Sequence, residues 1–145
     1  MNEPRTPEST VDGEEELYFA FSATLRIFAP QLDLDDITRS MHVDPSAVHR
    51  AGDRARPKSR PRPHDMWMFS PNVPEASPLA EHIDALWHAV RPNTTYLLEL
   101  KRSAKVDVFL GYRSNSDTAG FEIPAASLEI FAALDIPFSV SVIVA

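Results

Sequence analysis

The chain has 145 residues, no cysteine and a formal net charge of −7. The absence of cysteine excludes disulfides, thiolate zinc sites and cysteine nucleophiles, and the acidic balance disfavours general binding to nucleic acid. Hydrophobic residues make up 43% of the chain, which is close to the value for globular domains and favours one domain with a substantial core.

Residues 1–16 predict a disordered acidic head. They hold six acidic residues and one basic residue and show no hydrophobic period, so they bury too little apolar surface to offset the entropy cost of ordering. The head lacks the apolar centre of a signal peptide, and no apolar run approaches the roughly 18 residues of a membrane span. We therefore expect a cytoplasmic protein, not associated with a membrane, in which residues 17–145 form a single α+β domain.

The first expected elements are a strand, a short helix and a brief second strand. Residues 17–28 alternate between apolar and more polar side chains, which predicts a strand with one buried face. Asp33 has the position of a helix N-cap, an apolar stripe follows at helical spacing, and Asp44 before Pro45 ends the helix. Residues 46–51 then allow a brief strand.

A basic loop is expected next, over residues 52–64. Residues 49–64 carry six basic residues and one acidic residue in an otherwise acidic chain, and the three prolines of the loop exclude a central strand. Alternation over residues 65–70 predicts the third strand. The cations of the loop are Arg54, Arg56, Lys58, Arg60 and Arg62.

Residues 77–102 predict a helix that is interrupted once. Ser77 is the expected N-cap, with Pro78 at the first helical position. Apolar residues follow at helical spacing, and Pro92 is expected to kink or break the helix.

The last third of the chain predicts a strand over residues 106–113, a helix after Pro124 and a final strand over residues 135–145. The resulting order is β-α-β-β-α-β-α-β, so a ferredoxin-like β-α-β-β-α-β core is expected with a C-terminal α-β extension. The alternation favours a five-stranded, mainly antiparallel sheet with three helices on one face and the other face partly open.

Four segments of the chain together resemble a known family. They are FSATLRI at residues 21–27, LDLDDITRSMHVDPSAVHRAGD at 32–53, RPRPHDMW at 60–67 and VDVFLGYRSNSDTAGFEIP at 106–124. Over about residues 17–145, the chain is similar to the uncharacterised bacterial family called domain of unknown function 4279 (DUF4279). The resemblance implies a compact α+β domain from a bacterium, and it implies no activity.

The basic loop is one candidate for function. Its cations, with the adjacent Trp67, suit phosphate contacts and base stacking. The alternatives are a solvated loop and a loop that docks the acidic head, whose charge is opposite and of similar size.

The open face of the sheet is the other candidate. Arg26 and Asp107 are expected to form a strand-to-strand ion pair. Alternatively, Arg26 and Arg113 bind a carboxylate or a phosphate, in a groove that Trp67 and Tyr112 line. The residues expected on this face are Ser22, Thr24, Arg26, Asp107, Phe109, Arg113, Ser139 and Ser141.

No catalytic, metal or cofactor motif is present. The five histidines lack ligand spacing, and neither a GxSxG elbow nor a glycine-rich phosphate loop occurs. We therefore expect a non-enzymatic module of the regulatory or immunity type that binds another protein. The alternative is a binder of an anionic small molecule or polyanion through the basic loop and the open face. The Val-rich last strand suits a homodimer if it lies at a sheet edge.

Overall fold

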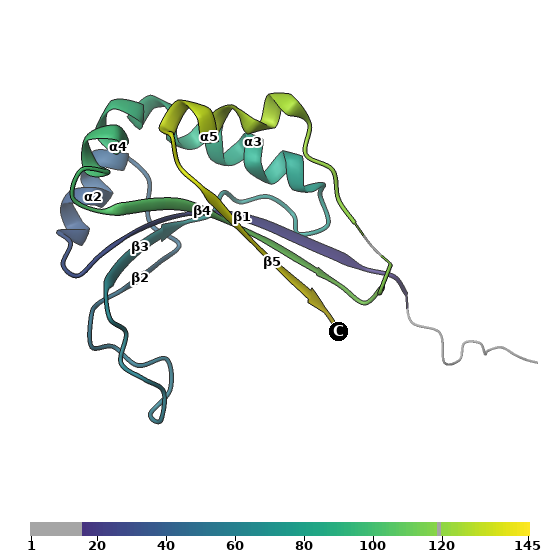
Figure 1. The fold of residues 1–145 in the computed structure, drawn as a ribbon, viewed down its shortest axis with the longest axis horizontal. Coiled ribbons are helices and arrows are strands. Elements are labelled where there is room, and N and C mark those ends of the chain that lie inside the picture. The colour runs from purple at the N-terminus through teal and green to yellow at the C-terminus, as the bar shows by residue number, and fades with distance from the viewer. Residues whose placement is uncertain (1–15, 119) are drawn as a thin grey trace, which may run out of the picture.

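The computed structural model describes residues 16–118 and 120–145, and in this range helices cover one side of a five-stranded sheet (Figure 1). The predicted acidic head lies outside the described residues, apart from Glu16. The strands are β1 (Phe19–Ala29), β2 (Ala47–His49), β3 (Asp65–Phe69), β4 (Lys105–Ser114) and β5 (Phe138–Val144). The helices are α2 (Leu34–Met41), α3 (Leu79–Val90), α4 (Thr94–Leu100) and α5 (Glu129–Leu134), with 3-10 turns η1 (Arg91–Asn93) and η2 (Ala125–Leu128).

The sheet has the order β2-β3-β1-β4-β5 and is mixed. The β2–β3, β3–β1 and β1–β4 ladders are antiparallel, whereas β5 runs parallel to β4. A parallel pair needs a crossover, and η2 with α5 supplies it on the helix side. The predicted α+β class and the five strands are confirmed. The ferredoxin-like core stays a prediction, since that fold is also defined by how its helices cross over.

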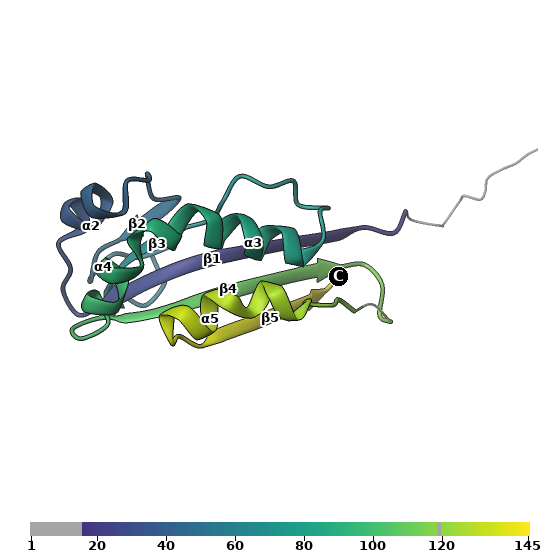
Figure 2. The ribbon, with the colours of Figure 1, turned by 90° about the horizontal axis from the view of Figure 1, so that it is seen from above.

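The core lies between the sheet and the helices, which all lie on one side of it (Figure 2). Every second side chain of the two long central strands points to this layer, and the apolar stripe of α3 packs on it. The fully buried side chains include Leu25 and Ile27 of β1, Val108 and Leu110 of β4, and Ile83, Leu86 and Val90 of α3.

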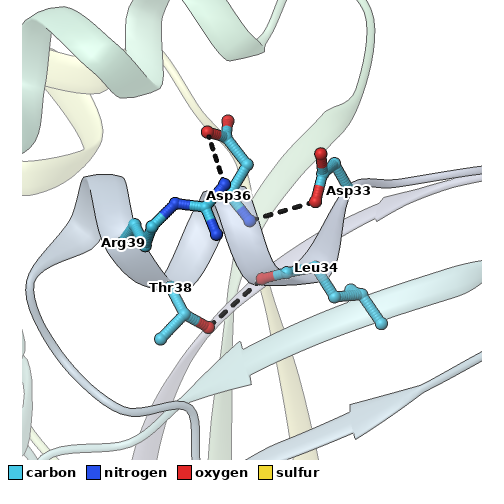
Figure 3. Close-up of polar contacts among 5 residues, drawn as sticks. All are labelled: Asp33, Leu34, Asp36, Thr38 and Arg39. Carbon is cyan, nitrogen blue, oxygen red and sulfur yellow. Dashed lines mark hydrogen bonds and ion pairs between the residues drawn. The ribbon is translucent and has the colours of Figure 1, made fainter.

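Helix α2 begins as its sequence predicts. The Asp33 carboxylate accepts a hydrogen bond from the Asp36 amide at 3.1 Å, which satisfies one of the free amides at the helix start (Figure 3). Within the helix, Arg39 lies 3.5 Å from the Asp36 carboxylate, and the Thr38 hydroxyl donates to the Leu34 carbonyl at 3.2 Å. The predicted N-cap at Asp33 is confirmed.

Helix α3 begins one residue later than predicted, so Ser77 as N-cap is wrong. Pro78 occupies the N-cap position with extended backbone angles (φ −54°, ψ 149°) and no side-chain cap, and the helix starts at Leu79. The interruption at Pro92 is confirmed, because this residue lies in η1 between α3 and α4. None of the described helices combines the length and the apolar composition that a membrane span needs.

Candidate functional site

The sheet face opposite the helices has no covering layer among the described residues (Figure 1). Because side chains alternate along a strand, the positions between the core residues point to this side. We call this surface the open face. It is formed by Ser22, Thr24, Arg26 and Phe28 of β1, Met66 and Met68 of β3, Asp107, Phe109, Gly111 and Arg113 of β4, and Ser139, Ser141 and Ile143 of β5.

An ion pair lies on the open face between β1 and β4. Arg26 stands opposite Asp107 in the ladder and donates from Nε and Nη2 to the two carboxylate oxygens at 2.8 and 2.7 Å. The hydrogen bond to Asp107 raises the pKa of Arg26. The Arg26 Cζ also lies 4.9 Å from the ring centroid of Phe109 and 5.9 Å from that of Phe28. The predicted ion pair is confirmed, and it leaves Arg26 neutralised.

Large apolar side chains surround this ion pair. Phe28 and Phe109 flank it along β1 and β4, and Met66 and Met68 approach from β3, where Met68 stands opposite Arg26. All four side chains are partly exposed. An antiparallel sheet with one solvated face usually carries polar residues on that face, so this aromatic and methionine surface is typical of a contact surface.

Gly111 leaves a hollow in the open face next to Phe109. A Cβ at Gly111 would lie 2.5 Å from the Ser22 Oγ, so the missing side chain keeps room for that hydroxyl. The hollow has a volume of about 200 Å³, and Phe109, Arg113 and Ser141 are among its walls. It therefore offers an aromatic wall, hydroxyl groups and two opposite charges, since Glu75 lines it as well as Arg113.

A second pocket, of about 210 Å³, lies where the open face meets the basic loop. We call it the corner pocket. The rings of Phe28 and His64 meet edge to face in it, with centroids 6.1 Å apart. Because Arg26 is already paired, Arg62 is a lining cation without a carboxylate partner among the described residues. The pocket is lined by Arg26, Phe28, His49, Arg62, Pro63, His64 and Met66.

The base of the basic loop is ordered by paired backbone groups. The Gly52 amide donates to the Arg62 carbonyl at 2.8 Å, and the Arg62 amide donates to the Asp53 carbonyl at 2.7 Å. Gly52 has a φ of +94°, which L side chains rarely adopt, so the turn requires glycine. The rest of the loop projects away from the sheet (Figure 1). Within the described residues, no loop cation forms an ion pair.

Asp65 anchors this loop to the sheet. Its carboxylate accepts hydrogen bonds from the Ala51 amide at 2.7 Å and from the Leu32 amide at 2.9 Å. These bonds hold the pKa of Asp65 below its usual value, because they favour the charged carboxylate. The anchor sets the start of the loop, and hence the corner pocket, against the sheet.

Trp67 and Tyr112 do not lie on the open face, so the groove predicted from them is wrong. Trp67 stands opposite Ile27 on the helix side, is fully buried and donates from its indole nitrogen to the Thr38 hydroxyl at 3.0 Å. Tyr112 is also buried and stacks on Phe21 with ring centroids 5.0 Å apart. Because side chains alternate along a strand, both residues stand at positions whose side chains point into the core.

Arg113 and Arg26 are also not brought together. In the β1–β4 ladder, Arg113 stands opposite Ala20, whereas Arg26 stands opposite Asp107. The six residues from Asp107 to Arg113 along β4 span about 20 Å. One small anion therefore does not contact both arginines, and Arg113 belongs to the hollow at Gly111.

Sequence reasoning missed several residues of these surfaces. A signal was present for the methionines, because Met66 and Met68 alternate with Trp67 and one of the two sets must face away from the core. No such signal existed for His49 and His64, which reach one pocket only because the basic loop returns to the sheet.

The histidines do not form a metal centre within the described residues. No three His, Asp or Glu side chains come together there as ligands of one ion. In the corner pocket, His49 and His64 lie beside Arg62, whose charge repels a cation. The polar groups of this pocket suit an anion better than a metal ion.

Comparison with known proteins places the chain in a family. A family model described as a domain of unknown function (DUF4279) matches residues 16–145. Neither the curated proteins nor the solved structures contain a match to the chain. The family match spans all the strands and helices described above, and it carries no activity with it.

Proposed function

The chain belongs to the DUF4279 family, and because the description of that family names no activity, we propose a function from geometry: a non-enzymatic module that binds another protein through its open face. The observation that carries this proposal is the set of partly exposed Phe and Met side chains around the neutralised pair of Arg26 and Asp107. Centres of protein interfaces are enriched in aromatic residues, Met and Arg and depleted of unpaired charge. The open face has this composition.

The chemistry of the surface indicates what the partner offers. The hollow at Gly111 has room for one apolar side chain against the Phe109 ring, and the charges of Arg113 and Glu75 in its lining oppose each other. The basic loop adds five further cations at the other end of the face. We therefore propose a partner segment with an apolar anchor residue and acidic neighbours. A regulatory or immunity-type role in the cytoplasm fits the size and charge of the chain, by analogy alone.

The test compares two glutamate substitutions at exposed apolar positions. Phe109→Glu places a charge in the open face, and the matched Leu98→Glu places one on α4, where Leu98 is 42% exposed on the helix side. Tagged full-length chains capture partners from a native lysate, and quantitative mass spectrometry compares the amounts. We expect wild type and Leu98→Glu to capture the same partner, and Phe109→Glu to capture at least about tenfold less of it. If Phe109→Glu and Leu98→Glu capture the same partners in equal amounts, the proposal is contradicted.

The corner pocket favours a second candidate function, the binding of an anionic small molecule or polyanion. The observation behind it is Arg62, which has no carboxylate partner among the described residues and lies with His49 and His64 in one pocket. Side chains of this kind bind phosphate and carboxylate groups.

Thermal shift with nucleotides, sugar phosphates and oligonucleotides tests this candidate at low and high salt. A ligand at 100 times its Kd stabilises by about 2.7 kcal/mol, which raises the Tm of a domain of this size by about 5–10 °C. Arg62→Gln should remove the shift, whereas Arg113→Gln, at the Gly111 hollow, should keep it. No shift with any compound refutes this candidate and leaves the protein-binding proposal standing.

A further inference from the structure

We propose that β5 is the pairing edge of a homodimer, in which the β5 strands of two copies run antiparallel about Ser141 and join both sheets. This inference is independent of what binds the open face. β5 lies at one edge of the sheet, with β4 as its only neighbour in the described strand order. Figure 2 shows it at the side of the sheet farthest from β2.

Backbone hydrogen bonds show which groups of β5 are free to pair. The Ala145 amide donates to the Ser114 carbonyl at 3.0 Å, and the Pro137 carbonyl accepts from the Val108 amide at 3.2 Å. Odd-numbered residues along β5 therefore direct their backbone groups toward β4. Since these groups alternate in direction along a strand, the even-numbered residues direct theirs to the outer edge. They are Phe138, Val140, Val142 and Val144.

The side chains of β5 give this edge no protection. The strand reads FSVSVIV, with no charged residue and no proline, although edge strands usually carry such residues against pairing with another chain. The other edge differs, because β2 has only three residues and leads into the basic loop. Phe138 and Val140 are each 43% exposed, Ile143 is 51% exposed, and Val142 and Val144 are each 55% exposed.

A second copy fits this edge because the strand is complementary to itself. With the two-fold axis at Ser141, the outward backbone groups of the even-numbered residues face each other and form the hydrogen-bonded pairs. No charge meets a like charge, although each chain carries a net charge of −7. The same patch serves both copies, so the dimer closes. The facing pairs are Val140 with Val142, Phe138 with Val144, and Ser139 with Ile143.

The small contact indicates a weak dimer. One strand of seven residues buries less than the roughly 800 Å² per partner of a standard interface, so we expect a reversible dimer with a dissociation constant on the order of 1 μM or weaker. The axis is perpendicular to the sheet, so both open faces lie on the same side of the joined sheet. Dimer formation therefore leaves the open faces accessible to a partner.

The first test measures oligomeric state by sedimentation velocity between about 1 and 500 μM, a range that spans the expected affinity. Val142→Lys places a charge in the pairing edge, and the matched Val48→Lys places one on β2, where Val48 is 45% exposed. We expect wild type and Val48→Lys to dimerise with rising concentration and Val142→Lys to stay monomeric, with unchanged circular dichroism. A monomeric wild type, or a Val142→Lys variant that dimerises like wild type, overturns the proposal.

The second test introduces a single cysteine in place of a charge. Since the chain contains no cysteine of its own, any disulfide between two copies forms at the introduced position. Two copies of Ser141 would form a pair without hydrogen bonds, with Cα atoms about 4.5 Å apart, which lies within the range for a disulfide. Two copies of Ser139 would lie about 13 Å apart along the strands. We expect Ser141→Cys to cross-link under mild oxidation and Ser139→Cys not to do so. Equal cross-linking, or none in either variant, contradicts the dimer.

Discussion

Removing one partner of the ion pair between Arg26 and Asp107 should destabilise the fold more than removing both. Arg26→Met leaves the Asp107 carboxylate without its guanidinium on a largely apolar surface. Asp107→Leu leaves the guanidinium without its carboxylate. The double variant removes both charges, and its side chains pack against the neighbouring rings of Phe28 and Phe109.

The exposure of the pair sets the magnitude. The side chains of Arg26 and Asp107 are 24% and 12% exposed, so the pair lies between a surface pair, worth about 0–1 kcal/mol, and a buried pair, whose disruption costs about 3–5 kcal/mol. We expect Arg26→Met to cost about 2 kcal/mol and Asp107→Leu somewhat less, since Arg26 is more exposed and keeps its aromatic contacts. The double variant should lie within about 1 kcal/mol of wild type.

Urea unfolding at pH 7, followed by the fluorescence of the buried Trp67 and Trp87, measures all four proteins. The two single costs add up to more than about 3 kcal/mol and the double variant lies near wild type, so the double-mutant cycle should give a coupling free energy of about 3 kcal/mol between the two side chains. Effects that add to within about 0.5 kcal/mol would show that the two groups act independently. That result would refute the view that the ion pair is a neutralised unit of the open face.

Four further substitutions test the rest of the structure. Because the folded pKa of Asp65 lies below its ordinary value of 3.8, its stabilisation is complete above that pH and is lost as the pH falls through the folded pKa. The stability difference between wild type and Asp65→Asn, from urea unfolding at pH 7 and below pH 4, should therefore shrink with falling pH; a constant difference would count against the anchor. Asn93→Ala removes a buried amide that donates to the Met41 carbonyl at 2.8 Å and should cost about 1–3 kcal/mol in urea unfolding, whereas a cost below about 0.5 kcal/mol would contradict this role. Trp67→Phe should cost about 1–3 kcal/mol by cavity and hydrogen-bond loss. Thr38→Val keeps the Trp67 ring but removes its hydrogen bond and the bond from the Thr38 hydroxyl to the Leu34 carbonyl, and it should cost about 1–2 kcal/mol. Equal costs for Thr38→Val and Trp67→Phe would show that packing at Trp67 contributes nothing.

The sequence by itself determined the features that depend on near neighbours. The alternation of residues 106–113 predicts a strand that the structure places at Lys105–Ser114, because a period of two has the same meaning in any sheet. Asp33 caps α2 and Pro92 interrupts the helical segment, since both effects act within one turn. The ion pair was predicted only through the expected fold, which makes its two strands neighbours, and the ladder between β1 and β4 places Arg26 opposite Asp107.

Only the tertiary structure decided which elements meet. Periodicity states that Met66 and Met68 point away from Trp67, but the ladder with β1 determines that Trp67 takes the core side. The same ladders separate Arg113 from Arg26, and the crossover through α5 makes β5 a parallel strand at an edge. Register and strand order come from contacts between residues distant in the sequence, and local propensity does not encode these contacts. The hollow at Gly111, the corner pocket and the free edge of β5 therefore appear only in the folded sheet.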